Sequence, residues 1–204
     1  MLDHLVYAVP DLEEAVARLE QRLGVRPAAG GSHPGSGSRN ALLALGGSAY
    51  LEIIGPDPDQ PAPAQRPFGL DGLTEPRLVT WAAKAPDMEA RVERARAAGY
   101  DPGPIVDGSR RLPDGSSLEW RLAIRGEPTG DGLVPFLIDW RGARHPSQTS
   151  PQGCTLVALR GEHPRPGPVR ALLDAVDVKL EISEGAAPAL IASLATPRGP
   201  VELR

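Results

Sequence analysis

The chain has 204 residues, of which 41% are hydrophobic and 24% are charged. This composition is typical of a folded globular protein, and the length suits one large domain or two small, closely packed ones. A formal net charge of −4 without blocks of Lys and Arg argues against a nucleic-acid surface. We expect no membrane partner, because no stretch is long and apolar enough to span a bilayer. The N-terminus shows no signal-peptide pattern, so a cytoplasmic location is predicted.

The single cysteine, Cys154, excludes a disulfide framework and any metal site built from cysteines alone. It precedes the apolar segment Thr155–Leu159, which favours a buried core thiol over a reactive nucleophile.

The first unit begins with a predicted strand over His4–Val9, which Pro10 ends because proline has no N–H for a sheet ladder. Apolar residues at helical spacing predict a helix over Leu12–Leu23, and Gly24 is a typical residue to end it. The glycine- and serine-rich segment over residues 30–38 is interpreted as a mobile lid or hairpin tip.

Two further strands are predicted over Asn40–Leu45 and Ala49–Ile54, joined by a glycine-rich turn that favours a hairpin. Five prolines over residues 56–67 then form a linker that suits neither a helix nor a central strand.

The same plan then repeats. We predict a strand over Leu78–Ala83, a helix over 88–98, and strands over Ser117–Ile124 and Pro135–Trp140. Such a repeat indicates architecture better than any single element does. The predicted units are residues 1–60 and 74–146.

A third, shorter unit is predicted over residues 152–204. Its expected elements are a strand over 155–159, a helix over 169–176 and strands over 179–182, 190–194 and 201–203. So short a unit buries too little apolar surface alone, so we expect it to pack on the rest of the chain or to form a homodimer interface.

Three segments together resemble one known superfamily. The run Asp3–Leu12 places a histidine in a strand before Val-Pro-Asp-Leu and a helix, and Leu51–Ile54 matches a closing strand. Phe136–Trp140 and the later pair His145-Pro146 complete the set. These motifs resemble the vicinal oxygen chelate superfamily, and within it the glyoxalase-like domain proteins. The resemblance implies an α+β fold in which tandem βαβββ modules form a curved mixed-sheet cup.

The resemblance also implies a metal centre. Enzymes of the superfamily hold a divalent metal on ligands from the first and last strands of each module, leaving positions open for two substrate oxygens. His4 and Glu52 match the ligand positions of the first module. In the second module Thr80 replaces the histidine and Asp139 is the approximate counterpart of Glu52. The implied cofactor is one divalent ion (Fe, Mn, Ni or Zn) on His4, Glu52 and Asp139, and otherwise none.

Further side chains are candidates for binding a small-molecule ligand or for catalysis. Aromatic and convergent polar residues are common in pockets, and this predicts ligand binding by Asn40, Trp81, Trp120, Arg121 and Trp140. Glu52 is a candidate general base, and His145 a candidate acid or base. His33 and His163 each precede a proline, and both are predicted to lie in exposed turns. The chain contains no phosphate-binding loop and no GxSxG, CxxC or HExxH motif.

Three functions stay open from the sequence. The first is a lyase, isomerase or dioxygenase acting on a small oxygenated metabolite with a divalent metal. The second is a metal-independent enzyme in which Glu52 alone is the base. The third is a non-catalytic protein of the same fold that sequesters a small molecule among its tryptophans.

Overall fold

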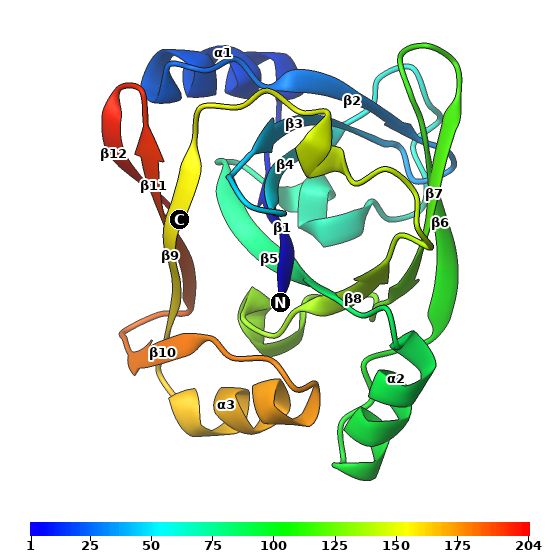
Figure 1. The fold of residues 1–204 in the computed structure, drawn as a ribbon, viewed down its shortest axis with the longest axis vertical. Coiled ribbons are helices and arrows are strands. Elements are labelled where there is room, and N and C mark those ends of the chain that lie inside the picture. The colour runs from blue at the N-terminus through cyan, green and yellow to red at the C-terminus, as the bar shows by residue number, and fades with distance from the viewer.

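Eight strands close into a barrel in the computed structural model, which describes residues 1–204 (Figure 1). Their order around the barrel is β1-β4-β3-β2-β6-β7-β8-β5. The first module supplies β1 (Leu2–Ala8), β2 (Ala28–His33), β3 (Ser38–Ala44) and β4 (Tyr50–Pro56). The second supplies β5 (Arg77–Lys84), β6 (Ile105–Arg111), β7 (Ser117–Ala123) and β8 (Phe136–Asp139).

The two modules repeat one pairing pattern. β1 runs parallel to β4, as β5 does to β8, and β1 and β5 pair antiparallel where the modules meet. On the opposite side the barrel closes through a single bridge between Ser32 and Arg111. The predicted α+β class with tandem βαβββ modules is therefore confirmed. Strands β2 and β6 are not predicted from the sequence, because their glycines weaken the pattern typical of strands.

Helices α1 (Leu12–Leu23) and α2 (Met88–Ala97) lie on the outside of the barrel. The Asp11 carboxylate caps α1 by accepting the backbone N–H of Glu14 at 2.9 Å, and Gly24 ends it at φ 78°. The buried face of α1 packs Leu19 and Leu23 against the sheet. Both helices thus cover the outer surface and leave the interior free.

Strand alternation separates two apolar regions. Leu5 and Tyr7 of β1 point outward into a core of 35 buried residues, whereas Val6 and Ala8 point into the barrel and join a cluster of only 8. Most apolar packing therefore lies between the barrel and its covering elements. The interior keeps room for a ligand.

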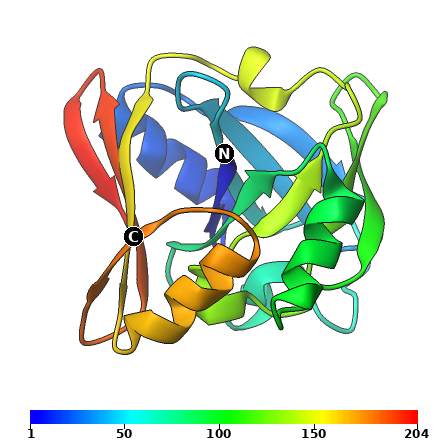
Figure 2. The same ribbon diagram turned by 60° about the horizontal axis from the view of Figure 1, so that its bottom comes forward.

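The last unit forms a second sheet of order β10-β9-β11-β12 that packs on the barrel (Figure 2). Its elements are β9 (Thr155–His163), α3 (Pro166–Ala175), β10 (Glu181–Glu184), β11 (Ala189–Thr196) and β12 (Gly199–Leu203). Leu156 N–H donates to Leu45 O, and Leu78 N–H to Arg204 O, both at 2.9 Å. Buried residues of this sheet also join the outer core.

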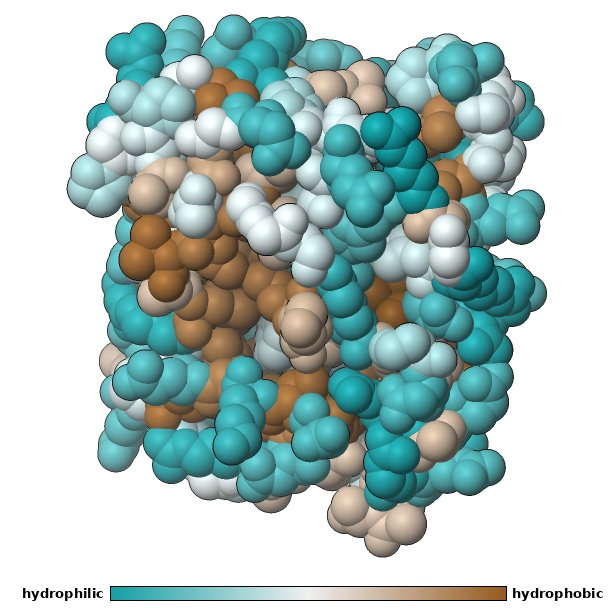
Figure 3. Space-filling model, in the orientation of Figure 1, coloured by the Kyte–Doolittle hydropathy of each residue, from teal (hydrophilic) through white to brown (hydrophobic).

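Apolar atoms gather on the surface between β9 and the barrel, on the side that faces the viewer in Figure 3. Val157 of β9, with 68% of its surface exposed, is one of the few large hydrophobic residues left open to solvent. The homodimer stays a prediction, which sedimentation can test. None of the helices has the length and apolar character needed to cross a membrane.

Candidate active site in the barrel

The barrel interior contains a cavity of about 360 Å³. Its polar lining comes mainly from β1 to β4 and β6, and its apolar lining mainly from β7, β8 and the segment before β5. The lining includes the side chains of His4, His33, Asn40, Tyr50, Glu52, Phe68, Arg110, Trp120, Phe136 and Trp140. Of the predicted site residues, the structure brings His4, Asn40, Glu52, Trp120 and Trp140 together here.

Glu52 of β4 presents its carboxylate to this cavity, with 10% of the side chain exposed. Asn40 Nδ2 on the neighbouring β3 donates to Glu52 Oε1 at 2.5 Å. The other oxygen, Oε2, lies 3.6 Å from His4 Nε2, and Oε1 lies 3.7 Å from His33 Nε2. The carboxylate is therefore oriented by one amide and flanked by two imidazoles.

A buried carboxylate holds His4 in place from behind. Asp3 has no exposed surface, and its oxygens lie 2.7 Å from His4 Nδ1, 3.0 Å from His145 Nε2 and 3.1 Å from Trp140 Nε1. Burial alone would raise the pKa of Asp3, but the hydrogen bonds from His145 and His4 and their charges outweigh it and lower the pKa far below its ordinary value. Since a carboxylate only accepts, His4 Nδ1 must carry a proton and donate it to Asp3.

His33 is a site residue, and the prediction that it lies in an exposed turn was wrong. Residues 28–33 form β2 and turn the ring inward, where 14% of the side chain is exposed. Its Nδ1 lies 3.1 Å from Ser38 Oγ. Burial lowers the pKa of His33, although the Glu52 charge opposes the effect. His163, also expected in an exposed turn, is buried and bonds Asp131 at 3.0 Å.

Arg110 of β6 is a second site residue missed from the sequence. It is 5% exposed, and its Nη1 donates to Asn40 Oδ1 at 3.4 Å. The side chain crosses the glycine pair of β2. A Cβ on Gly30 would lie 2.2 Å from Asn40 Oδ1 and 3.0 Å from Arg110 Nη1, and one on Gly31 would lie 1.9 Å from the Arg111 backbone oxygen and 3.0 Å from Arg110 Cγ. Glycines in β2 therefore leave room for Asn40, for Arg110 and for the backbone of β6, and the same glycines weaken the sequence pattern that predicts the strand.

Aromatic rings form the opposite wall of the cavity. The Trp120 and Trp140 rings lie 5.3 Å apart, and Phe68 and Phe136 lie 6.1 Å apart. A Cβ at position 108 would lie 2.4 Å from Trp120 Nε1, so Gly108 lets the indole lie against β6. The cavity thus has a polar half and an apolar half, as ligand sites commonly do.

Three predicted site residues do not line this cavity, because they alternate with residues that face the barrel interior. Thr80 and Ala82 occupy the inward positions of β5, so Trp81 points into the outer core, where Nε1 donates to Leu133 O at 2.9 Å. Arg121 follows Trp120, and Asp139 follows Ile138. Trp120 and Ile138 line the cavity, so Arg121 and Asp139 point outward by the same alternation. Arg121 and Asp139 bind each other at 3.0 Å, and Arg121 also binds Glu89.

His145 likewise stays outside the cavity. It caps the short 3₁₀ turn Pro146–Gln148, with Nδ1 2.8 Å from Ser147 Oγ and Nε2 on Asp3. Its ring packs behind Tyr50 and Trp140 at centroid distances of 5.5 and 5.6 Å. With both ring nitrogens engaged, His145 supports the site rather than facing a ligand.

The donors implied for a divalent metal do not come together. His4 and Glu52 are adjacent, but Asp139 points away and is neutralised by Arg121. No group of three His, Cys, Asp or Glu side chains is arranged to hold an ion. The residues present therefore do not fit the metal centre of the superfamily.

Because these donors do not fit a metal, we expect metal removal to leave the thermal stability unchanged. Dialysis against EDTA, followed by addition of Mn²⁺, Ni²⁺ or Zn²⁺, should shift the Tm by less than about 1 °C, because a ligand stabilises only through a site that it binds in the folded state. Thermal unfolding followed by circular dichroism measures the shift. A metal-specific rise of several degrees that His4→Ala removes would contradict the expectation.

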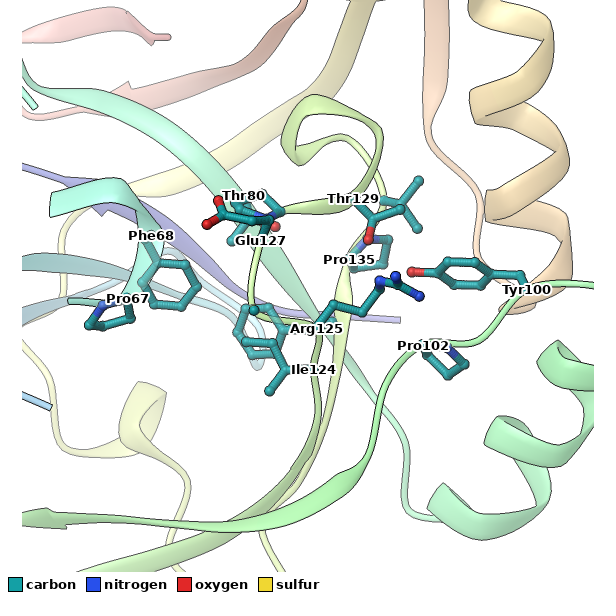
Figure 4. Close-up of a pocket in the computed structure, with 14 residues that line it drawn as sticks. Pro67, Phe68, Thr80, Tyr100, Pro102, Ile124, Arg125, Glu127, Thr129 and Pro135 are labelled. Atoms are coloured by element: carbon teal, nitrogen blue, oxygen red, sulfur yellow. The ribbon is translucent and has the colours of Figure 1, made fainter. Parts of the chain in front are cut away.

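A second cavity of about 220 Å³ adjoins the first, because Pro67, Phe68, Ile124 and Phe136 line both. Figure 4 shows Phe68 at one end of it and Tyr100 at the other, with Arg125 between them. Arg125 donates to the backbone oxygen of Asp101 at 3.0 Å. The second cavity holds no paired acid and base comparable to Glu52 and His4.

The fold and its strand pairing are those of a vicinal oxygen chelate protein. A family model described as "Glyoxalase-like domain" matches residues 2–176, and the chain belongs to this family. No curated protein matches the chain.

Solved structures resemble the chain to different extents. A hypothetical protein from Staphylococcus aureus has 11% identity and a TM-score of 0.69, covering 100% of this chain and 98% of its own. A methylmalonyl-CoA epimerase from Mycobacterium tuberculosis has 25% identity and a TM-score of 0.43, covering 67% and 85%. One from Streptomyces coelicolor has 19% identity and a TM-score of 0.44, covering 67% and 94%. The first of these shares the fold over the whole chain, including the C-terminal sheet.

Proposed function

We propose that this protein is an isomerase or lyase that moves a proton on a small oxygenated metabolite bound inside the barrel, with Glu52 as the general base. One observation carries the proposal: a nearly buried carboxylate that lines the barrel cavity, with one oxygen fixed by Asn40 and the other free of hydrogen bonds and 3.6 Å from His4. A base must be oriented toward the proton it removes, and this arrangement supplies that orientation.

The chemistry follows from the atoms that face the cavity. Glu52 Oε2 is placed to accept a proton from a carbon next to a carbonyl group. His4 and His33 are within 3.7 Å of the same carboxylate and can exchange a second proton with the ligand. Dioxygenase chemistry is not proposed, because the donors for a redox metal are not assembled.

The test is exchange of carbon-bound hydrogen with solvent. The EDTA-treated protein is incubated in D₂O with 2-oxo acids, 2-hydroxy ketones and thioesters, and ¹H NMR follows the loss of each α-hydrogen signal. We expect exchange of at least one compound above the buffer rate. A complete absence of exchange across the three classes would remove the proposal.

The second candidate function is sequestration of a small molecule without chemistry, which the wall of Trp120, Trp140, Phe68 and Phe136 favours. Binding that quenches tryptophan fluorescence, without deuterium incorporation into any bound compound, would favour this function over catalysis.

A further inference from the structure

Arg110 differs from the other partly unsatisfied arginines of the chain. Four arginines have a buried nitrogen without a hydrogen-bond partner. Three of them are paired with a carboxylate: Arg39 with Glu13, Arg91 with Asp87, and Arg121 with Glu89 and Asp139. The fourth, Arg110, takes part in no salt bridge, although only 5% of it is exposed.

The contacts of Arg110 leave most of its binding capacity unused. Its Nε is buried without a partner, and the contact from Nη1 to Asn40 Oδ1 is long, at 3.4 Å. A guanidinium carries five N–H donors in a planar fork. Burying such a cation without an acceptor is costly, so an acceptor that completes the fork is expected from outside the chain.

The position of the side chain shows where that acceptor would lie. Arg110 lines the same cavity as Glu52, and Asn40 lies between them, accepting from Arg110 and donating to Glu52. An anion bound to the guanidinium would therefore be one amide width away from the base. A short ligand can reach both groups at once.

We propose that Arg110 binds the carboxylate of the substrate, which makes the substrate class a short carboxylic acid with a carbonyl or hydroxyl group next to its reacting carbon. The proposal rests on the proposed function in taking this cavity as the reaction site. The carboxylate lies on the Arg110 fork, the reacting C–H faces Glu52, and an apolar tail packs on Trp120 and Trp140.

A carboxylate fits better than a phosphate. Carboxylate matches a single guanidinium in a bidentate geometry and brings one negative charge. The cavity has only one arginine, no lysine, and already the carboxylate of Glu52. A doubly charged phosphate monoester would leave more negative charge uncompensated near the Glu52 carboxylate, of which only 10% is exposed.

Fluorescence titration of the tryptophans tests the assignment, because Trp120 and Trp140 line the cavity whereas Trp81 lies in the outer core. The probes are 4-methyl-2-oxopentanoate, its methyl ester, and isopentyl phosphate. We expect the wild-type protein to bind the acid about ten- to hundredfold more tightly than the ester or the phosphate, the range for charged hydrogen bonds. Arg110→Gln should remove this preference and leave the affinity for the ester unchanged.

Arg111→Gln is the matched control, since Arg111 is the next residue of β6 and is exposed. It should keep the full preference for the acid. Arg110→Lys retains the charge without the fork and should show an intermediate preference, which keeps the test decisive if the glutamine variant does not fold.

Three results would overturn the proposal. In titrations up to about 10 mM ligand, the wild-type protein does not bind the acid more tightly than the ester, or it binds the phosphate more tightly than the acid. The third result is that Arg110→Gln keeps the preference for the acid. Failure of the proposed function is separate: a carboxylate preference that depends on Arg110, without deuterium exchange, would keep this assignment and remove catalysis. Deuterium exchange without such a preference would keep catalysis and remove the assignment of Arg110.

Discussion

Glu52→Gln should lower the rate of deuterium exchange by about 10²- to 10⁴-fold, the range that a positioned general base contributes. The substitution keeps the shape of the side chain, and the amide oxygen can still accept from Asn40 Nδ2. It removes the basic oxygen that faces His4 and the cavity. The loss should fall on kcat, with KM changing less than about threefold, because a proton-transfer group acts in the transition state.

The measurement is the initial exchange rate of whichever compound the wild-type protein exchanges fastest, as a function of its concentration. Glu119→Gln is a suitable control, because Glu119 lies exposed on β7 and the substitution makes the same chemical change outside the cavity. A Glu52→Gln protein that stays folded and exchanges within tenfold of the wild-type rate would assign the base to another group.

The sequence was informative where local rules decide the structure. The helix over Leu12–Leu23 has a cap, an apolar stripe and a terminal glycine, and the structure places it over the same residues. The repeated order of elements predicted two βαβββ modules, and the barrel confirms them. His4 and Glu52 were selected by resemblance, and they lie 3.6 Å apart.

Strand alternation was harder to use, because it fixes which neighbours share a face but not which face is inside. Trp120 and Arg121 were both selected, and only Trp120 can point inward. Asp139 and Trp140 were likewise both candidates, and only Trp140 lines the cavity. Trp81 was selected as an aromatic residue, although its inward neighbour is Thr80. Choosing the face requires knowing where the helices pack, which is a tertiary property.

His33 and Arg110 were missed for a different reason. Both lie on strands that contain glycine and that pair with each other through a single bridge, so neither strand shows a strong apolar pattern. A side chain at these glycines would collide with Asn40, with the Arg111 backbone or with the Trp120 indole. The composition that builds this side of the site therefore weakens the signal that predicts its strands.

Asp3→Asn should lower the free energy of unfolding at neutral pH by about 3 kcal/mol, because it removes a fully buried charge from donors that stay in place. An amide has one acceptor oxygen, so it cannot accept hydrogen bonds from His4, His145 and Trp140 together as the carboxylate does. Asp174→Asn, an exposed change on α3, should shift stability by no more than about 0.5 kcal/mol. Urea unfolding measures both.

The destabilisation caused by Asp3→Asn should become smaller as the pH falls. The pKa of Asp3 is lowered in the folded protein relative to its ordinary value of 3.8, so the unfolded chain binds the proton more readily. The stabilisation by Asp3 is therefore complete above pH 3.8 and is lost as the pH falls below it. The difference in the free energy of unfolding between the wild-type protein and the variant should be constant from about pH 5 to about pH 7 and should shrink toward about pH 3. A difference that grows on acidification would contradict this assignment.

The same substitution should also slow catalysis without altering a residue that lines the cavity. The Trp140 indole can only donate, so the new amide must turn its oxygen toward Trp140 and its NH₂ group toward His4 Nδ1. His4 Nδ1 must then accept, and its proton moves to Nε2, 3.6 Å from Glu52 Oε2. A donor facing this oxygen weakens it as a base, so the exchange rate of Asp3→Asn should fall about tenfold or more. An unchanged rate in the folded variant would show that the orientation of the His4 proton has no part in the reaction.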